Sequence, residues 1–418
     1  MSAFFSIPGG RTFFGVIFLN ALIDLGHKIA LQNIVFKIYD GSQQIILVAI
    51  INACILLPYI GLVLPVAKTA DAHSKIKIMR ITAAASIFLT LGITLFYTLG
   101  WFWPAMLMTL LMAIQSAFYS PAKLAYLKLL WGAQRLSEAN GWAQAASISG
   151  ILSGTVVFSI GFEFLYATYA SLIIDKNTLT AMLWPLGVVL FGLATLQFYW
   201  VKKIPSVEEP ALKKDSSTVT RVTRQSLYQL LSERRRLFPV LGLALFWSVG
   251  QGMLAAFPAF AKAHAAIDNT AVIQAVLAAT GLGLALGAAV VGRVSAQRAE
   301  LRLVPVGVLG MSLCLWSLSE LSAAVAFASV YFLMGVASAC LIVPLNAYLQ
   351  INTPAEQLGS LIASSNFLQN IAMLFMLLLT IAVALLGLDS RYLIQLMALI
   401  TTVAGGYLAF NIIAESRN

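Results

Sequence analysis

Five polar residues recur at helical spacing within an otherwise apolar segment near the start of the chain. Spacings of three and four residues put Asn20, Asp24, His27, Lys28 and Gln32 on one face of a helix. A carboxylate and an ammonium four residues apart can pair, and a polar stripe of this kind can line a path for a charged ligand. Asp24 and Lys28 are therefore candidate ligand-binding residues. An ion pair that only holds helices together is the alternative.

The same stripe contains groups that could carry protons. Histidine titrates near neutral pH, so His27 and Asp24 are candidates for proton coupling. A histidine that is simply satisfied by hydrogen bonds is the competing interpretation.

A second candidate site is the run Tyr119-Ser120-Pro121-Ala122-Lys123. Pro121 removes one helical hydrogen bond and can leave carbonyl groups open to a polar ligand. The ammonium of Lys123 suits an anionic head group such as a phosphate diester, with Tyr119 beside it. A lysine that extends toward the membrane surface is the alternative for Lys123.

Uncharged amides in four other apolar segments form a third set of candidates. Amides suit hydrogen bonds to a zwitterionic or ester-bearing ligand, but they also join helices to one another, and spacing alone leaves both roles open. The set consists of Asn140, Gln144, Gln251, Asn346 and Asn366.

The composition indicates which kind of structural element must position these residues. Of 418 residues, 60% are hydrophobic and 10% are charged, whereas an ordinary soluble domain is about half apolar and a quarter charged. Long apolar runs without polar alternation predict membrane-spanning helices and exclude a β-barrel. The first apolar segment has no cleavage site, so we expect it to be retained.

Twelve spans are expected from the apolar runs and the charged or Pro/Gly-containing loops between them. The short ninth one is the weakest. Their approximate ranges are 12–38, 43–67, 78–99, 102–128, 138–162, 179–201, 237–261, 271–294, 303–319, 321–349, 357–387 and 391–414.

The placement of charge predicts the orientation. The net charge is +10, and most of the 26 lysines and arginines fall in loops on the side of the amino terminus. The positive-inside rule then places both termini in the cytoplasm. It also explains the net positive charge, so nucleic-acid binding is not needed to account for it. The basic stretch 202–236 divides the chain, so we expect six helices in 1–201, a cytoplasmic linker, and six helices in 237–418.

No sequence motif indicates an enzyme. The phosphate loop, the His-x-x-x-x-Asp acyltransfer motif and the Gly-x-Ser-x-Gly elbow are all missing from the sequence. The three cysteines, Cys54, Cys314 and Cys340, show no metal or redox spacing. We therefore expect a protein without catalytic residues, cofactor or metal, whose transport is driven by an ion gradient or by the gradient of its substrate.

With these residues in view, the chain resembles the major facilitator superfamily, and within it the lysophospholipid transporters and the transporter portions of acyltransferase and acyl-carrier-protein synthetase fusions. The stretches that carry the resemblance are Asn20 to Lys28, Tyr119-Ser120-Pro121-Ala122-Lys123, Glu138-Ala139-Asn140-Gly141, Leu245-Phe246-Trp247 and Val343-Pro344-Leu345-Asn346-Ala347 with Leu349-Gln350. The chain departs from the family where Ile23 and Leu25 flank Asp24, and near Leu254, where many members carry an arginine.

The resemblance implies an all-α fold of two pseudo-symmetric six-helix bundles in the bacterial inner membrane. It implies a monomer that flips lysophospholipids from the outer to the inner leaflet for reacylation, with Asp24 and Lys123 at the matching site positions. Membrane lipids and a lysophospholipid acyltransferase are the expected partners. Two alternatives stay open: a proton-coupled exporter of drugs, siderophores or other small metabolites, and a non-transporting membrane partner of an acyltransferase.

Overall fold

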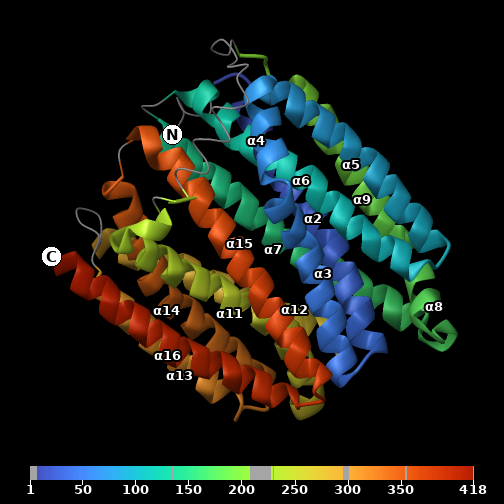
Figure 1. The fold of residues 1–418 in the computed structure, drawn as a ribbon. Coiled ribbons are helices and arrows are strands. Elements are labelled where there is room, and N and C mark those ends of the chain that lie inside the picture. Colours follow the sequence, from blue (N-terminus) through green and yellow to red (C-terminus); the bar gives the residue numbers. More distant parts are fainter. Residues whose placement is uncertain are drawn as a thin grey trace. The chain divides into compact units, whose positions relative to one another are not determined.

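The computed structural model describes residues 7–132, 135–207, 227–228, 230–294, 301–353 and 355–417. Within these ranges every regular element is a helix (Figure 1). In lipid, each backbone N–H and C=O group must find its partner inside the protein, and a helix provides these partners within one segment. The all-α character predicted from the apolar runs is confirmed.

The helices are named in chain order. Their bounds are α2 Gly10–Ile38, α3 Gly41–Gly61, α4 Val63–Ala72, α5 Lys75–Thr98, α6 Phe102–Trp131, α7 Leu136–Thr168, η1 Ala170–Leu172, α8 Lys176–Ala181, α9 Trp184–Lys203, α11 Arg234–Ala265, α12 Thr270–Val294, α13 Leu303–Leu318, α14 Ala324–Ile351, α15 Ala355–Leu385 and α16 Ser390–Arg417.

Most of these helices are long enough to cross a membrane. In the described part of the chain, 11 helices have the length and apolar character of membrane spans. The predicted ninth span is the shorter apolar helix α13, which has 16 residues. At about 1.5 Å per residue it reaches about 24 Å, less than the hydrocarbon core of about 30 Å. The chain is thus a multi-pass membrane protein.

Two predicted spans are each divided into two helices. The span expected at 43–67 is α3 followed by α4, and the one expected at 179–201 is α8 followed by α9. A proline cannot bond to the carbonyl four residues before it and crowds that carbonyl. Pro65 and Pro185 stand four residues after Gly61 and Ala181, the last residues of α3 and α8.

The chain divides into two compact units. Unit 1 comprises Met1–Ile38 and Leu57–Val219, and unit 2 comprises Tyr39–Leu56 and Thr220–Asn418. The first part of α3 therefore groups with the second half of the sequence. The predicted linker 202–236 lies largely outside the described residues, and the predicted boundaries 1–201 and 237–418 stay a prediction.

Unit 1 is organised around the packing of α2 on α7. Glycines make this contact close: a Cβ atom at Gly150 would lie 2.4 Å from the carbonyl oxygen of Phe18, and one at Gly154 would lie 3.0 Å from that of Leu22. A third glycine of α7, Gly141, would meet no described atom within 4 Å. Close packing therefore explains Gly150 and Gly154 but not Gly141.

Unit 2 also contains a close helix contact, between α12 and α14. A Cβ atom at Gly283 would lie 2.0 Å from the carbonyl oxygen of Phe332, and one at Gly335 would lie 2.1 Å from that of Thr280. Helices in a membrane associate through such small residues because lipid supplies no hydrophobic force between them.

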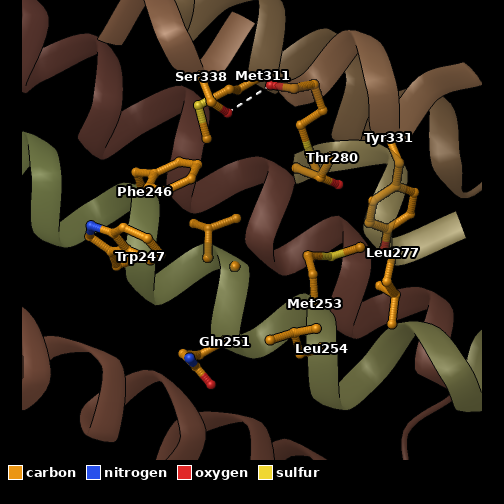
Figure 2. Close-up of a pocket in the computed structure, with 13 residues that line it drawn as sticks. Phe246, Trp247, Gln251, Met253, Leu254, Leu277, Thr280, Met311, Tyr331 and Ser338 are labelled. Atoms are coloured by element: carbon orange, nitrogen blue, oxygen red, sulfur yellow. Dashed lines mark hydrogen bonds between the residues drawn. The ribbon is translucent and has the colours of Figure 1, made fainter. Parts of the chain in front are cut away.

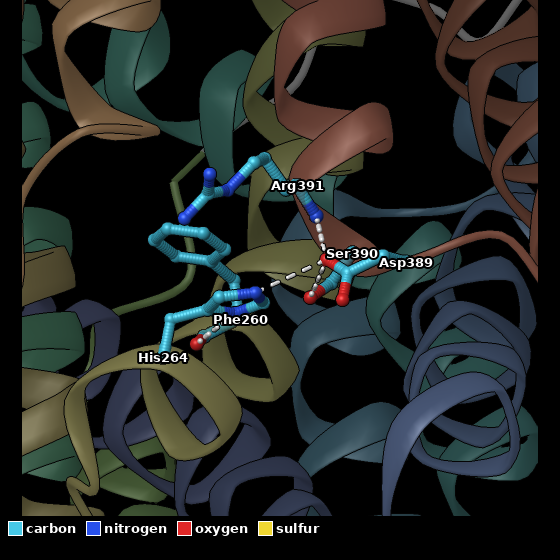
Figure 3. Close-up of polar contacts among 5 residues, drawn as sticks. All are labelled: Phe260, His264, Asp389, Ser390 and Arg391. Atoms are coloured by element: carbon cyan, nitrogen blue, oxygen red, sulfur yellow. Dashed lines mark hydrogen bonds and ion pairs between the residues drawn. The ribbon is translucent and has the colours of Figure 1, made fainter.

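Polar contacts hold the end of α11 to its neighbours within unit 2. His264 Nε2 lies 3.3 Å from Asp389 Oδ1, its ring stacks on Phe260, and the backbone N–H of Arg391 donates to the same Asp389 oxygen at 2.7 Å (Figure 3). Lys262 forms an ion pair of 2.7 Å with Asp40, in the segment just before α3. The end of α11 is thereby joined to the starts of both α16 and α3.

Candidate functional site

The carboxylate of Asp24 is the centre of a polar network in unit 1. Its Oδ2 accepts hydrogen bonds from Asn20 Nδ2 at 2.9 Å and from the hydroxyl of Ser116 on α6. Its Oδ1 is buried and has no partner among the described residues. One oxygen is thus held in place, while the other is left without a hydrogen-bond partner in the described chain.

The network continues to α9 and α5. Gln197 Nε2 donates to Asn20 Oδ1 at 3.0 Å. On the other side, the hydroxyl of Ser116 lies 3.1 Å from Gln115 Oε1, and Gln115 Nε2 donates to the backbone carbonyl of Thr82 at 3.2 Å. The orientation of Asp24 therefore depends on four helices of the same unit.

Neither Lys123 nor Lys28 forms a direct ion pair with this carboxylate in the described chain. Lys123 attracts Asp24 electrostatically, and its Nζ lies 5.7 Å from the ring centroid of Tyr119. Lys28 makes no hydrogen bond or ion pair within the described chain, so the pairing expected between Asp24 and Lys28 is not formed. An ammonium without a protein anion is a costly group in a membrane and favours an anionic ligand.

Tyrosines complete the surroundings of Asp24. The hydroxyl of Tyr119 is buried and has no partner in the described residues. Tyr59 and Tyr119 both interact electrostatically with the Asp24 carboxylate. Buried polar atoms normally have a partner, so the open Oδ1 and the open Tyr119 hydroxyl point to a bound polar ligand or to water.

His27 stands apart from this arrangement although it belongs to the same helix. Its Nε2 lies 3.1 Å from the carbonyl oxygen of Ala105, which can only accept, so Nε2 donates and Nδ1 accepts from the Tyr97 hydroxyl at 2.9 Å. The side chain is 1% exposed. This geometry fits a histidine that is satisfied by hydrogen bonds, which was one of the two interpretations of His27. The proton-coupling role of Asp24 and His27 stays a prediction.

The predicted amides form none of the hydrogen bonds described above for the Asp24 network. Asn140 and Gln144 are exposed on α7 and make no hydrogen bond within the described part of the chain. Asn346 donates to the carbonyl of Ile342 in its own helix, and Asn366 is exposed on α15. Both belong to unit 2, so their role in ligand binding stays a prediction.

Gln251 lines a separate cavity inside unit 2. The cavity has a volume of about 190 Å³ and lies between α11, α12, α13 and α14 (Figure 2). Its walls are mainly apolar and include Met253, Met311 and Met334. The Gln251 Oε1 atom and the Tyr331 hydroxyl are buried without a partner in the described chain.

Sequence reasoning did not identify Ser116, Gln115 or Gln197. Ser116 stands three and seven residues before Tyr119 and Lys123, on the same face of α6. The spacing argument used for the first span would have found it in the fourth. Gln197 is an isolated amide in an apolar helix, and only the fold brings it to Asn20.

The described residues offer no group of three or more His, Cys, Asp or Glu side chains that could hold a metal ion.

Long apolar helices in two units, with a charged polar site buried inside one of them, define a multi-pass membrane transporter. The profile of the Major Facilitator Superfamily matches residues 1–377. The chain belongs to this superfamily, and the predicted major facilitator fold is confirmed.

Curated relatives narrow the comparison. Lysophospholipid transporter LplT of Serratia proteamaculans (strain 568) is 25% identical over 345 residues, which cover 81% of this chain and 78% of that protein. Lysophospholipid transporter LplT of Klebsiella pneumoniae subsp. pneumoniae is 25% identical over 371 residues, which cover 86% and 85%. The resemblance noted from the sequence motifs is confirmed at this level.

Solved structures agree in fold. A bacterial homolog of the human lysosomal transporter Spinster, in an inward-facing and unoccupied conformation, aligns with a TM-score of 0.67 at 13% identity over 97% of this chain and 96% of that one. The nucleoside transporter NupG (D323A mutant) aligns with a TM-score of 0.70 at 12% identity over 97% and 99%.

Proposed function

We propose that this transporter carries lysophospholipids across the bacterial inner membrane, from the outer to the inner leaflet, by alternating access. The curated relatives that it matches are named for this substrate. Lysophospholipid delivered to the inner leaflet is a substrate for reacylation, so an acyltransferase is the partner to be expected. The orientation with both termini in the cytoplasm is part of the same proposal.

The observation that carries the proposal is the unsatisfied charge around Asp24. A lysophosphatidylethanolamine head group is zwitterionic, with an anionic phosphate diester and a cationic ammonium. Lys123 and Lys28 are complementary to the phosphate, and the open Oδ1 of Asp24 is complementary to the ammonium. The hydroxyl of Tyr119 supplies a further hydrogen bond to a phosphate oxygen.

The direct test is a flux assay with the purified protein in proteoliposomes and labelled lysophosphatidylethanolamine. Lys123→Ala is expected to reduce uptake at least about tenfold, the factor that corresponds to about 1.4 kcal/mol of lost binding. Lys176→Ala is a matched control, because Lys176 also lies over an aromatic ring, at 5.9 Å from the centroid of Trp103, but outside the network. Uptake that survives Lys123→Ala would contradict the site.

The same vesicles separate this function from proton-coupled export. An exporter of drugs or siderophores predicts flux that depends on a pH gradient and is indifferent to lysophospholipid. Lysophospholipid flux that persists after the gradient is dissipated supports the proposal, whereas vesicles that move only cationic drugs or chelators would overturn it.

A further inference from the structure

The cavity inside unit 2 offers a ligand an apolar interior without charge. No charged residue stands among the described side chains that line it. Met253, Met311 and Met334 contribute to its walls, and Phe246 and Trp247 lie together on one side (Figure 2). Methionine sulfur makes favourable contacts with aromatic rings, whereas a charged ligand would lose its hydration here without gaining an opposite charge. These walls favour an uncharged ligand with an aromatic body.

The volume of the cavity limits the ligand to a single ring. An engineered apolar cavity of about 150 Å³ in another protein binds benzene. The cavity of unit 2 measures about 190 Å³, which leaves room for one or two small substituents on such a ring. Pockets that enclose whole drug-sized molecules are larger, at roughly 300–1,000 Å³. A whole lipid therefore exceeds this space.

One polar group in the wall is both fixed and unsatisfied. Tyr331 on α14 is 2% exposed, and its ring packs edge-on against Phe257 with 4.8 Å between the ring centroids. Its hydroxyl has no partner among the described residues, and in Figure 2 the side chain extends toward Met253 and Leu277. Buried hydroxyl groups normally have a hydrogen-bond partner. The Tyr331 hydroxyl is therefore the anchor that a ligand in this cavity would use.

Two other polar residues of the wall are less suited to anchor a ligand. The Ser338 hydroxyl donates to the backbone carbonyl of Met334 at 2.7 Å, so its hydrogen is already engaged. Gln251 Oε1 is buried without a partner in the described chain, but the residue as a whole is half-buried, so its side chain can turn toward another partner. Tyr331 combines full burial with a fixed hydroxyl, which neither of these two residues does.

The wall of α11 leaves free space at one position. Gly250 lines the cavity, and a Cβ atom built on it would meet no described atom within 4 Å. Two residues further along, a Cβ atom at Gly252 would lie 2.2 Å from Met397 Cε. The first glycine borders open volume, and the second is required for packing. A larger side chain at Gly250 would therefore occupy the space of the ligand.

We propose that this cavity binds a small uncharged phenol, with its ring against the methionine side chains and its hydroxyl hydrogen-bonded to Tyr331. The site belongs to unit 2 alone, so the inference does not rest on the proposed function or on the Asp24 network. A phenolic hydroxyl can both donate and accept a hydrogen bond. The ligand and Tyr331 are therefore complementary in either direction.

The test is calorimetric titration of the purified protein with p-cresol, toluene and benzoate. Toluene has the ring of p-cresol without its hydroxyl, so comparing the two isolates the hydrogen bond. Benzoate is charged and should not bind. Tyr331→Phe keeps the protein's ring and removes its hydroxyl. In this variant we expect the ratio of p-cresol to toluene affinity to fall about three- to tenfold, the range that corresponds to one hydrogen bond.

Gly250→Leu fills the cavity and should weaken the binding of both p-cresol and toluene at least about tenfold. Gly281→Leu is the matched control for bulk, since a Cβ atom there also meets no described atom within 4 Å but the residue does not line the cavity. It should bind both ligands as the wild type does. Leucine is a better helix former than glycine, so neither leucine variant should disturb its helix.

Three results would each overturn the phenol site. They are an unchanged affinity ratio in Tyr331→Phe, equal binding by the wild type and Gly250→Leu, and benzoate binding as tight as that of p-cresol. Lysophospholipid flux tests the proposed function separately, and its outcome changes none of these expectations.

Discussion

Ser116 on α6 donates a hydrogen bond to Oδ2 of Asp24 on α2. Asn20 donates to the same oxygen, so both bonds fix the carboxylate from one side and leave Oδ1 without a protein partner in the described chain. A carboxylate held in this way is pre-organised for a cationic group, because its orientation is set before the ligand arrives.

Ser116→Ala should therefore impair transport although Ser116 itself is not proposed to touch the substrate. Loss of one hydrogen bond to a charged group is worth about 1.5–3 kcal/mol, and we expect the apparent affinity for lysophosphatidylethanolamine to fall about tenfold or more. Proteoliposome uptake at varied substrate concentration measures this apparent affinity. Ser312→Ala is the control, since in the described part of the chain that buried hydroxyl donates only to the Val308 carbonyl of its own helix. Equal affinities in the two variants would remove Ser116 from the site.

Gly150→Ala should destabilise the protein, while Gly141→Ala in the same helix should not. At Gly150 the added carbon would lie 2.4 Å from a backbone oxygen of Phe18, which cannot move without displacing α2. At Gly141 it meets nothing described within 4 Å, and alanine in place of a helical glycine stabilises by about 0.5–1 kcal/mol. Thermal unfolding of the purified variants compares them. A melting temperature lower for Gly141→Ala than for Gly150→Ala would contradict the α2–α7 packing.

The buried ion pair of Lys37 and Glu163 should contribute to the stability of the protein. The nitrogen to oxygen distance is 3.1 Å, the side chains are 9% and 17% exposed, and Lys37 also lies 4.2 Å from the ring centroid of Tyr166. Lys37→Met or Glu163→Leu alone leaves one buried charge, which costs about 3–5 kcal/mol, whereas the double variant should recover most of that loss. A double-mutant cycle in thermal stability measures the coupling. Additive effects would mean that the pair is not coupled.

The capping box of α8 predicts a local dependence on pH. Hydrogen bonds from Thr178, first from its backbone N–H, hold the pKa of Asp175 below its usual value. A lowered pKa means that the cap stabilises above the unfolded value of about 3.9 and is lost as pH falls through the folded value. Asp175→Ala should cost about 0.5–2 kcal/mol of helix stability and speed amide exchange in α8 at neutral pH.

Asp175→Asn is the matching control, because asparagine caps a helix about as well but carries no charge. Exchange in α8 should stay slow in that variant and should no longer respond to acid. Acid-sensitive exchange in Asp175→Asn would show that another group is responsible.

Much of the fold could be predicted from the sequence, because lipid imposes a length and a composition on every span. The helix starts and ends of α2, α6 and α12 lie within a few residues of the predicted ones. The interruptions at Gly61 and Ala181 were missed. Pro65 and Pro185 are visible in the sequence, but Pro121 and Pro344 lie inside uninterrupted helices. A proline alone therefore does not determine whether a helix is interrupted.

The candidate site was predicted in part. The spacing of Asn20 and Asp24 correctly placed them on one face, and they are hydrogen-bonded. The same spacing would allow Lys28 to pair with Asp24, but the described residues contain no ion pair between them. Spacing defines which residues share a face of one helix. The partner of a side chain depends on which residues of the neighbouring helix lie within reach.

The sequence by itself determined that the chain lies in lipid, the approximate limits of most spans, and which residues are too polar for lipid, since these depend on composition and on spacing within one segment. The tertiary structure decided that Ser116 orients Asp24, that His27 is closed off by Tyr97 and Ala105, and that a cavity stays open beside Gly250. Each of these depends on contacts between segments far apart in the chain, where packing rather than periodicity sets the distance.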